Sequence, residues 1–359
     1  MPATWVEPLG LLQGRAAGLA VATDIALPLA GGPAAFTMVR LIGRRGDTPA
    51  PAAPIALSEV PEAWQEDVLA LTRPPAPFPG LPEGRPLVMG IVNVTPDSFS
   101  DGGRHLDAGT AIEAGHAMLE AGADLLDIGG ESTRPGAEPV TPQQEARRIL
   151  PVVRELATAA TVSVDTRNAS TMLAALEAGA EIVNDISALR HDPAAARELA
   201  RAECGVILMH MRGDDPRTMQ HGIHYEDVAV EVAGFLADRV AWAEAQGIAR
   251  HRLAVDPGIG FGKQLPHNLA VIERLPLLLG IGCPVVFGAS RKRFIGEISG
   301  VEPAGGRAFG SVGAAIAAAQ RGAAILRVHD VAETVQALRV LAACEAGEVP
   351  AMDAEPVEE

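Results

Sequence analysis

The stretch Thr161-Val-Ser-Val-Asp-Thr-Arg-Asn-Ala-Ser-Thr-Met-Leu-Ala-Ala-Leu-Glu-Ala-Gly-Ala-Glu-Ile-Val-Asn-Asp185 contains one full unit of a repeating pattern. A short run rich in β-branched residues ends in Asp165, and a segment rich in Ala and Leu follows it. Gly179 then precedes a second apolar run that ends in Asn184 and Asp185, and glycine at such a place is typical of a helix C-terminus. The order strand, helix, strand predicts a βαβ unit with parallel strands.

The same pattern recurs along the chain between Leu87 and Arg327. We predict strands at 87–93, 124–129, 161–165, 181–185, 205–210, 252–256, 284–288 and 323–327, with helical segments between them such as 111–121 and 225–246. An open doubly wound sheet would concentrate function at one switch point. Because polar residues end nearly every predicted strand, we favour a closed (β/α)8 TIM barrel of the α/β class, whose active site lies at the carboxyl ends of the strands.

The chain divides into four regions by composition. Residues 1–73 form an N-terminal extension of unknown role, with a possible strand at 35–42 and a possible short helix at 59–71. Residues 74–86 contain six prolines and predict an extended linker. Residues 87–344 form the barrel, and 345–359 form an acidic tail with six negative charges.

Composition and charge exclude several classes of protein. The net charge of −16 argues against general nucleic-acid binding. The longest uncharged stretches fall short of the roughly 18 apolar residues that span a bilayer, and no signal sequence is recognisable at the N-terminus. Cys204, Cys283 and Cys344 show no spacing typical of a disulfide framework or a zinc site. We therefore expect a cytoplasmic protein.

Two further motifs have weak functional interpretations. The sequence Gly258-Ile-Gly-Phe-Gly-Lys263 lacks the spacing of a phosphate-binding P-loop, so we interpret it as a tight loop at the active site. His221 and His224 have no third ligand nearby in sequence, and surface histidines are a better interpretation than a metal pair.

Two loops that follow the first two predicted strands are rich in small and polar residues. The segment Asn93–Gly103 has one aromatic residue, Phe99, and suits a mobile lid over the barrel mouth or a plain surface loop. The segment Gly129–Gly136 supplies Arg134, whose guanidinium can bind an anion through two hydrogen bonds.

Acidic and basic residues end different groups of strands. Asp165, Asn184 and Asp256 would converge on one barrel mouth, where carboxylates need hydrogen-bond donors from a ligand or from cations. A planar heterocycle with amino and ring N–H groups would meet that need, although any single one could be a structural acid or a helix cap. The segments Ser290-Arg-Lys292 and Arg327-Val-His329 end the last two strands, the usual place of a phosphate site in barrels. We infer an anion pocket there, with a solvated basic patch as the alternative.

These motifs together resemble the dihydropteroate synthase family. The matching strings occur in family order over about residues 86 to 342, and they are Gly90–Gly103, Gly129–Gly136, Ser163–Thr166, Asn184–Ile186, Leu208–Met211, Asp256–Lys263, Ser290–Lys292 and Arg327–Asp330.

The resemblance implies roles for individual residues. The pterin would be bound by Asp165, Asn184, Ile186, Met209, Asp256, Phe261, Gly288 and Lys292. The pyrophosphate would be bound by Asn93, Arg327 and His329. The p-aminobenzoate would be bound by Phe99, Thr133, Arg134, Pro135, Phe261 and Ser290. Mg2+ would be held by Asn93 and Asp101. The residues implied in catalysis are Asn93, Asp101, Lys292, Arg327 and His329.

The resemblance also implies a reaction and an assembly. The family are transferases of folate biosynthesis, targeted by sulfonamides, that join 6-hydroxymethyl-7,8-dihydropterin pyrophosphate to p-aminobenzoate. The C–O bond would break first, the arylamine would then attack, and Mg2+ with cationic side chains would stabilise the departing pyrophosphate. A homodimer through the late outer helices is also implied.

Two alternatives stay open at this point. A pterin-binding methyltransferase barrel would share the acidic contacts, but it lacks the combined Asp97–Asp101, Ser290–Lys292 and Arg327–His329 segments. A catalytically silent pterin-binding protein would bind without turnover, and the joint presence of the implied catalytic residues argues against it.

Overall fold

The computed structural model describes residues 4–45, 48–49, 53–79, 81–82, 84–94, 104–131, 140–216, 218–220 and 222–347. The predicted lid residues Phe99 and Asp101 lie outside the described residues, as do Thr133, Arg134, Pro135 and His221.

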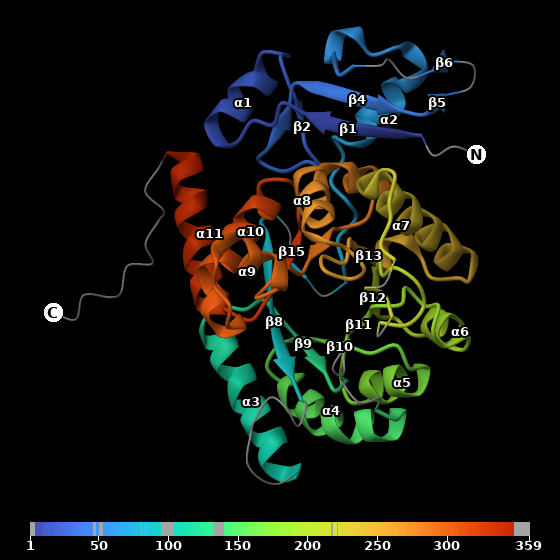
Figure 1. Ribbon diagram of the computed structural model, residues 1–359, viewed down its shortest axis with the longest axis vertical. Helices are drawn as coiled ribbons and strands as arrows, with labels where there is room; N and C mark the ends of the chain where they lie inside the picture. Colours follow the sequence, from blue (N-terminus) through green and yellow to red (C-terminus); the bar gives the residue numbers. More distant parts are fainter. Residues whose placement is uncertain are drawn as a thin grey trace, which may run out of the picture.

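Eight parallel strands form the barrel, which confirms the predicted fold class (Figure 1). They are β8 (Leu87–Asn93), β9 (Leu125–Gly129), β10 (Thr161–Asp165), β11 (Ile182–Asp185), β12 (Gly205–Met209), β13 (Leu253–Asp256), β14 (Val286–Phe287) and β15 (Ile325–Val328). Neighbouring strands pair in chain order from β8 to β13, and β15 lies between β8 and β14. A single parallel bridge between Val255 and Val285 closes the ring.

Helices surround the strands and alternate with them in sequence. They are α3 (Arg104–Glu120), α4 (Pro142–Leu156), α5 (Ala169–Glu177), α6 (Ala195–Arg201), α7 (Val228–Ala245), α8 (Leu265–Glu273), α9 (Arg293–Ser299), α10 (Ala308–Ala319) and α11 (Val331–Ala346), with the 3-10 turns η4 (Arg250–Arg252), η5 (Leu275–Ile281) and η6 (Ala304–Arg307). Among the helices that the structure describes, none is long and apolar enough to cross a membrane.

Local sequence explains where several of these helices begin and end. The Thr141 side chain accepts from the Gln144 amide and the Gln144 side chain accepts from the Thr141 amide, a capping box that starts α4. Asp227 caps α7 by accepting from the amide of Val230. The expected glycine turns are present after α5, where Gly179 has a φ of 110°, and at the corresponding turn after α3.

Side chains that point into the barrel form an apolar layer at its amino-terminal end. The layer consists of Leu87, Met89, Leu125, Ile182, Ile207, Ala254, Val286 and Ile325. Phe78 of the proline-rich linker packs into the same cluster, and a Cβ at Gly205 would lie 2.7 Å from its ring. Since strand side chains alternate, the next inward positions on the strands form a second layer, which is largely polar and contains the site.

The N-terminal extension contains more strand than its sequence suggested. Its elements are β1 (Trp5–Leu9), α1 (Gly14–Ala22), β2 (Leu27–Pro28), β3 (Ala35–Phe36), β4 (Met38–Ile42), β5 (Arg44–Arg45), β6 (Thr48–Pro49), β7 (Ile55–Ala56), η1 (Leu57–Glu59), η2 (Glu62–Trp64) and α2 (Gln65–Ala70). The strand expected at 35–42 is interrupted at Thr37, and β4 pairs antiparallel with β1 and β7. The helix expected at 59–71 begins as a 3-10 turn and continues as α2.

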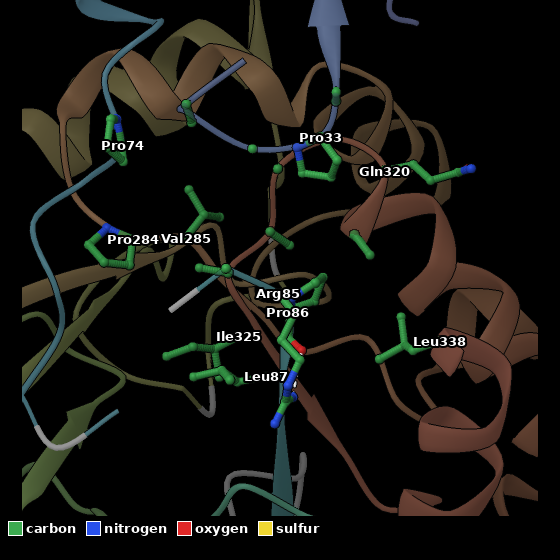
Figure 2. A pocket seen from close by; sticks show the side chains of 18 of the residues that line it. Pro33, Pro74, Arg85, Pro86, Leu87, Pro284, Val285, Gln320, Ile325 and Leu338 are labelled. Atoms are coloured by element: carbon green, nitrogen blue, oxygen red, sulfur yellow. Dashed lines mark hydrogen bonds between the residues drawn. The ribbon is translucent and has the colours of Figure 1, made fainter. Parts of the chain in front are cut away.

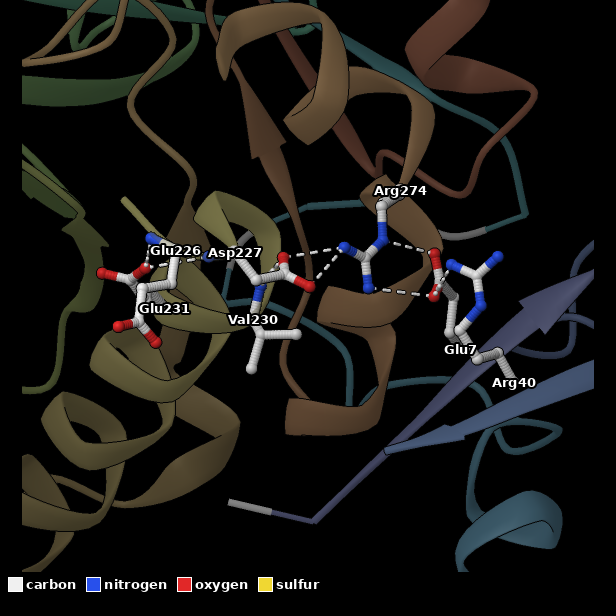
Figure 3. A network of polar contacts seen from close by, with 7 residues as sticks. All are labelled: Glu7, Arg40, Glu226, Asp227, Val230, Glu231 and Arg274. Carbon is white, nitrogen blue, oxygen red and sulfur yellow. Dashed lines mark hydrogen bonds and ion pairs between the residues drawn. The ribbon is translucent and has the colours of Figure 1, made fainter. Parts of the chain in front are cut away.

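A buried ion-pair network joins the extension to the barrel (Figure 3). Arg274, between α8 and η5, donates to Glu7 of β1 at 2.6 and 3.0 Å and to Asp227 at 2.7 and 2.8 Å. Glu7 is 1% exposed and also accepts from Arg40 at 3.1 Å. Because a buried carboxylate is costly without partners, these contacts fix the extension against the barrel.

A cavity of about 1090 Å³ lies between the extension, the linker and the barrel (Figure 2). Pro33, Pro74 and Pro284 contribute to its walls, together with Val285 and Leu338. The strand residues that line it stand at the beginning of their strands, so the cavity opens at the amino-terminal end of the barrel. The active sites of such barrels lie at the opposite end.

Candidate active site

Arg327 of β15 is the centre of a polar cluster inside the carboxyl end of the barrel. Its Nε donates to Oδ2 of Asp127 at 2.6 Å, and its Nη2 donates to Oδ2 of Asp165 at 2.9 Å. Asn184 donates from Nδ2 to the same Asp127 oxygen at 3.1 Å. Four different strands therefore supply one connected network.

The environment of this cluster shifts the protonation equilibrium of Asp165. Burial raises the pKa of Asp165 to about 7, although Arg327 acts in the opposite direction and Asp127 adds to the rise. About a fifth of the side-chain surface of Asp165 is still exposed at the mouth. This carboxylate can therefore face a bound ligand while it holds Arg327.

Asp256 and Lys292 both form hydrogen bonds with the glycine loop 258–262. Oδ1 of Asp256 accepts from the Gly258 amide at 2.6 Å, and Nζ of Lys292 donates to the carbonyl of Ile259 at 2.6 Å. The Lys292 ammonium also lies 4.8 Å from the ring centre of Phe261, a cation–π contact. Burial lowers the pKa of Lys292 to about 8 despite the nearby Asp256, and burial raises the pKa of Asp256.

Apolar side chains form one wall beside these polar groups. The predicted residues Ile186, Met209 and Phe261 belong to one cluster, together with Met211 and Met219. Methionine and phenylalanine present a polarisable surface that suits a flat aromatic ring. The structure thus brings the acidic and the apolar candidates together.

The predicted anion-binding residues Ser290 and His329 are also neighbours. The Ser290 hydroxyl accepts from the His329 amide at 3.1 Å and lies 3.0 Å from its Nδ1. The basic residues beside them point elsewhere, because Arg291 pairs with Asp330 and Arg293 pairs with Glu297. Of the basic segment 290–293, Lys292 is the residue that reaches the site.

Two further predicted residues border the cluster. Gly288 follows β14, and a Cβ built there would lie 3.7 Å from Arg327 and 3.8 Å from Asp256. Asn93 ends β8 and is half-buried. Within the part of the chain that the structure describes, no group of three or more His, Cys, Asp or Glu residues could hold a metal.

Comparison with known proteins identifies the family. Residues 89–329 match the family described as pterin binding enzyme. Dihydropteroate synthase of Escherichia coli K12 is 45% identical over 260 residues, which cover 72% of this chain and 91% of that relative. The relative from Neisseria meningitidis serogroup C is 48% identical, covering 71% of this chain and 91% of that relative. The chain belongs to the dihydropteroate synthase family.

Solved structures agree with this assignment. A Xanthomonas albilineans dihydropteroate synthase with 4-aminobenzoic acid superposes with a TM-score of 0.69 at 51% identity, covering 74% of this chain and 94% of that one. The same organism's enzyme in complex with 7,8-dihydropteroate gives a TM-score of 0.67 at 48% identity, covering 74% and 95%. The extension precedes the residues that match the pterin binding enzymes.

Asp127 belongs to the polar cluster, although our sequence analysis did not single it out. It is fully buried on β9, and its Oδ1 has no hydrogen-bond partner among the described residues. A signal was available, because Asp127 lies two residues from both Leu125 and Gly129 and therefore shares their inward face, as Asp165 does on its own strand. We overlooked it because it does not end its strand.

The neighbours Asn184 and Asp185 have different surroundings, although both end the same strand. The Asp185 carboxylate accepts from the amides of Ser187 at 2.7 Å and Leu189 at 2.9 Å. It therefore stabilises the loop after β11, in which Ala188 and Leu189 have positive φ. Only Asn184 joins the Arg327 cluster.

Proposed function

We propose that this chain joins 6-hydroxymethyl-7,8-dihydropterin pyrophosphate to p-aminobenzoate, giving 7,8-dihydropteroate and pyrophosphate. The observation that carries the proposal is the gathering of Asp165, Asn184, Asp256, Lys292 and Arg327 at one end of the barrel. The similarity to solved enzymes that contain 4-aminobenzoic acid and 7,8-dihydropteroate supports it.

The pterin ring would bind between Asp256 and Lys292. The Asp256 carboxylate can accept from the amino group and an adjacent ring N–H of the pterin as a charge-assisted pair. Lys292 would exchange its contact with the Ile259 carbonyl for the pterin carbonyl. Asn184 would contact the ring edge, and Phe261 would cover a face.

The leaving group would bind near Arg327 and His329. The guanidinium has five N–H donors, of which two are engaged by Asp127 and Asp165, so further donors can bind the pyrophosphate. Breaking the C–O bond transfers its electron pair to pyrophosphate and leaves a methylene cation that the dihydropterin ring delocalises. Cationic groups held in place before the reaction lower the barrier to this charge separation.

The arylamine would then form the new C–N bond. Its nitrogen is neutral at pH 7 and attacks the methylene carbon, and the proton it loses passes to water. The reaction therefore needs no strong base, in agreement with a site whose described acids serve as hydrogen-bond acceptors. The p-aminobenzoate would lie near Ser290 and Phe261.

Mg2+ fits this scheme as an ion held mainly by the substrate. Asn93 provides an amide oxygen at the end of β8, and the predicted partner Asp101 lies outside the described residues. Mg2+ commonly uses one or two protein oxygens with phosphate oxygens and water. When bound, it would neutralise negative charge on the pyrophosphate.

A release assay tests the proposed function. Purified protein with the pterin pyrophosphate, p-aminobenzoate and Mg2+ should release pyrophosphate, and omission of p-aminobenzoate should abolish steady release. Binding of the pterin substrate without turnover would favour the silent pterin-binding alternative. Calorimetry on the same preparation separates the two results.

We also propose a homodimer in the cytoplasm. Large apolar side chains are exposed on the late outer helices, with Phe309 of α10 at 89% and Ile298 of α9 at 59%. Exposed apolar residues that cluster on one side are typical of an interface. Light scattering should give the dimer mass, and Phe309→Arg should shift this mass toward that of the monomer.

The cysteines support the cytoplasmic location. The free thiols of Cys204, Cys283 and Cys344 suit a reducing compartment.

A further inference from the structure

Lys263 is a buried lysine whose polar contacts all lie beneath the glycine loop of the site. It follows the loop directly and is 4% exposed. Its Nζ donates to the carbonyls of Gly258 at 2.9 Å and Phe261 at 3.3 Å, and it lies 2.8 Å from Nδ1 of His210. Among the described residues, no carboxylate forms an ion pair with it. A buried cation of this kind is costly, so the contacts that it makes call for an explanation.

Every carbonyl of the loop above it accepts a hydrogen bond from a side chain, and the Gly258 carbonyl also accepts from the Phe261 amide at 3.0 Å. Gly258, Gly260 and Gly262 have positive φ, so the loop cannot pair with a strand. The five carbonyls of 258–262 accept, in order, from Lys263, Lys292, Gln220, Lys263 and Tyr225. Lys263 alone serves two of them, and it does so from the buried side.

The contact with His210 completes the bonding of the amine in either protonation state. An ammonium uses three protons for two carbonyls and the imidazole Nδ1. A neutral amine would use two protons for the carbonyls and accept Nδ1–H from the other tautomer. The His210 ring is itself fixed edge-on against Phe235 at 4.9 Å, so the partner is rigidly placed.

We infer that Lys263 is a positioning residue for the pterin substrate. It fixes the glycine loop so that Phe261 can cover the pterin ring and the Ile259 carbonyl can hold Lys292 in place. The inference rests on the proposed function. Lys263 holds the Gly258 and Phe261 carbonyls. Lys292 contacts the carbonyl of Ile259, which lies between them in the loop, and the Phe261 ring. Without Lys263, the Phe261 carbonyl would lose its donor and the Gly258 carbonyl would keep only the Phe261 amide, so the loop would rearrange to reach water.

The variant Lys263→Met tests this role because it keeps the length of the side chain and removes its donors. Calorimetry with dihydropterin pyrophosphate should show a dissociation constant about tenfold higher, the size expected for an unpaired buried carbonyl. The kcat should stay within about threefold, since the Arg327 cluster is untouched. Arg274→Met is the matched control, because it removes a buried cation at the other end of the barrel and should leave the dissociation constant unchanged.

A double-mutant cycle with Phe261→Ala separates positioning from a general loss of stability. If Lys263 acts through Phe261, the double variant should bind no more weakly than Phe261→Ala alone. Fully additive losses would overturn the inference. The wild type is assayed in parallel: an inactive wild type overturns the proposed function, whereas an active wild type with an unaffected Lys263→Met overturns only the role of Lys263.

A second pair of variants keeps the test decisive if Lys263→Met does not fold. His210→Ala removes the third partner of the amine, and His210→Asn can place an amide oxygen where Nδ1 lies. The Ala variant should weaken pterin binding several-fold, and the Asn variant should restore it. Equal binding by both variants would contradict the positioning role.

Discussion

At the scale of single residues, chemically similar side chains have different uses because of their neighbours. Asp165 and Asp256 face the mouth, Asp185 binds the amides of its own loop, and Asp330 pairs with Arg291. Asp127 illustrates the point most clearly, since it holds Arg327 from inside the barrel and is fully buried. A carboxylate in that place orients the guanidinium as well as balancing its charge.

The variant Asp127→Asn should separate these two effects. The amide oxygen can still accept from Asn184, so we expect the fold to persist. The same oxygen can still accept from Arg327, so the variant keeps the orienting hydrogen bond and removes the negative charge, and kcat/KM should fall about tenfold or more. Steady-state kinetics would check this. Ser163→Ala is the control, because its hydroxyl is buried on the adjacent strand without a hydrogen-bond partner among the described residues. Equal kinetics for wild type and Asp127→Asn would show that the charge is dispensable.

The pKa of Lys292 predicts an alkaline limit to activity. Burial lowers this pKa to about 8, so the ammonium form is complete well below pH 8 and is lost as the pH rises through 8. If Lys292 donates to the pterin, kcat/KM should fall about tenfold per pH unit above pH 8. Lys292→Arg, which stays charged, should lose this limb. A profile of kcat/KM against pH for both proteins is the measurement, and an unchanged limb in the Arg variant would exclude Lys292 as its source.

At the scale of elements, the joint between β1 and the start of α7 depends on one guanidinium. Arg274 connects Glu7 of the extension with Asp227, the residue that caps α7. The capping contact and the ion pair use the same carboxylate. The extension is thereby linked to a barrel helix through atoms that also define where this helix begins.

We expect Arg274→Met to lower the free energy of unfolding by about 3 kcal/mol, because the buried Glu7 would retain only its contact with Arg40. Chemical denaturation would measure the change. Arg73→Met removes a partner from an exposed ion pair with Glu66 and should alter stability little. Equal midpoints for the two variants would show that the buried network contributes no stability.

At the scale of the whole molecule, the two ends of the barrel have different coverings. The carboxyl end contains the polar site, and the linker and the extension cover the amino-terminal end (Figure 1). Phe78 enters the apolar layer there and is 6% exposed. We propose that the extension, the linker and the barrel unfold together as one unit.

Truncation of the Phe78 side chain should destabilise the barrel without altering its enzymatic activity. Phe78→Ala would leave a void in the apolar layer and should cost about 3 kcal/mol of unfolding free energy. The KM values should be unchanged, because the layer of site residues lies between Phe78 and the substrates. Thermal and denaturant unfolding would check this, with Leu19→Ala on α1 as the exposed control. Unfolding of the linker at lower denaturant than the barrel would contradict a single unit.

The sequence alone determined the repeat, and with it the fold and the end of the barrel where the site lies. Alternating and periodic apolar residues are local properties, so strands such as 87–93 and 161–165 could be predicted to the residue. The position of Asp165, Asn184 and Asp256 at strand ends followed from the same periodicity, and the family followed from the motifs.

Only the tertiary structure decided which partner each polar group takes. Arg327 meets Asp127 across 200 positions of chain, and Lys263 meets His210 across 53. The contacts by which Phe78 and Glu7 help to cover the amino-terminal end of the barrel could not be predicted from the sequence pattern either. The physical reason is that periodicity fixes the direction in which a side chain points, whereas hydrogen bonds and ion pairs depend on distances between elements that only the closed barrel sets.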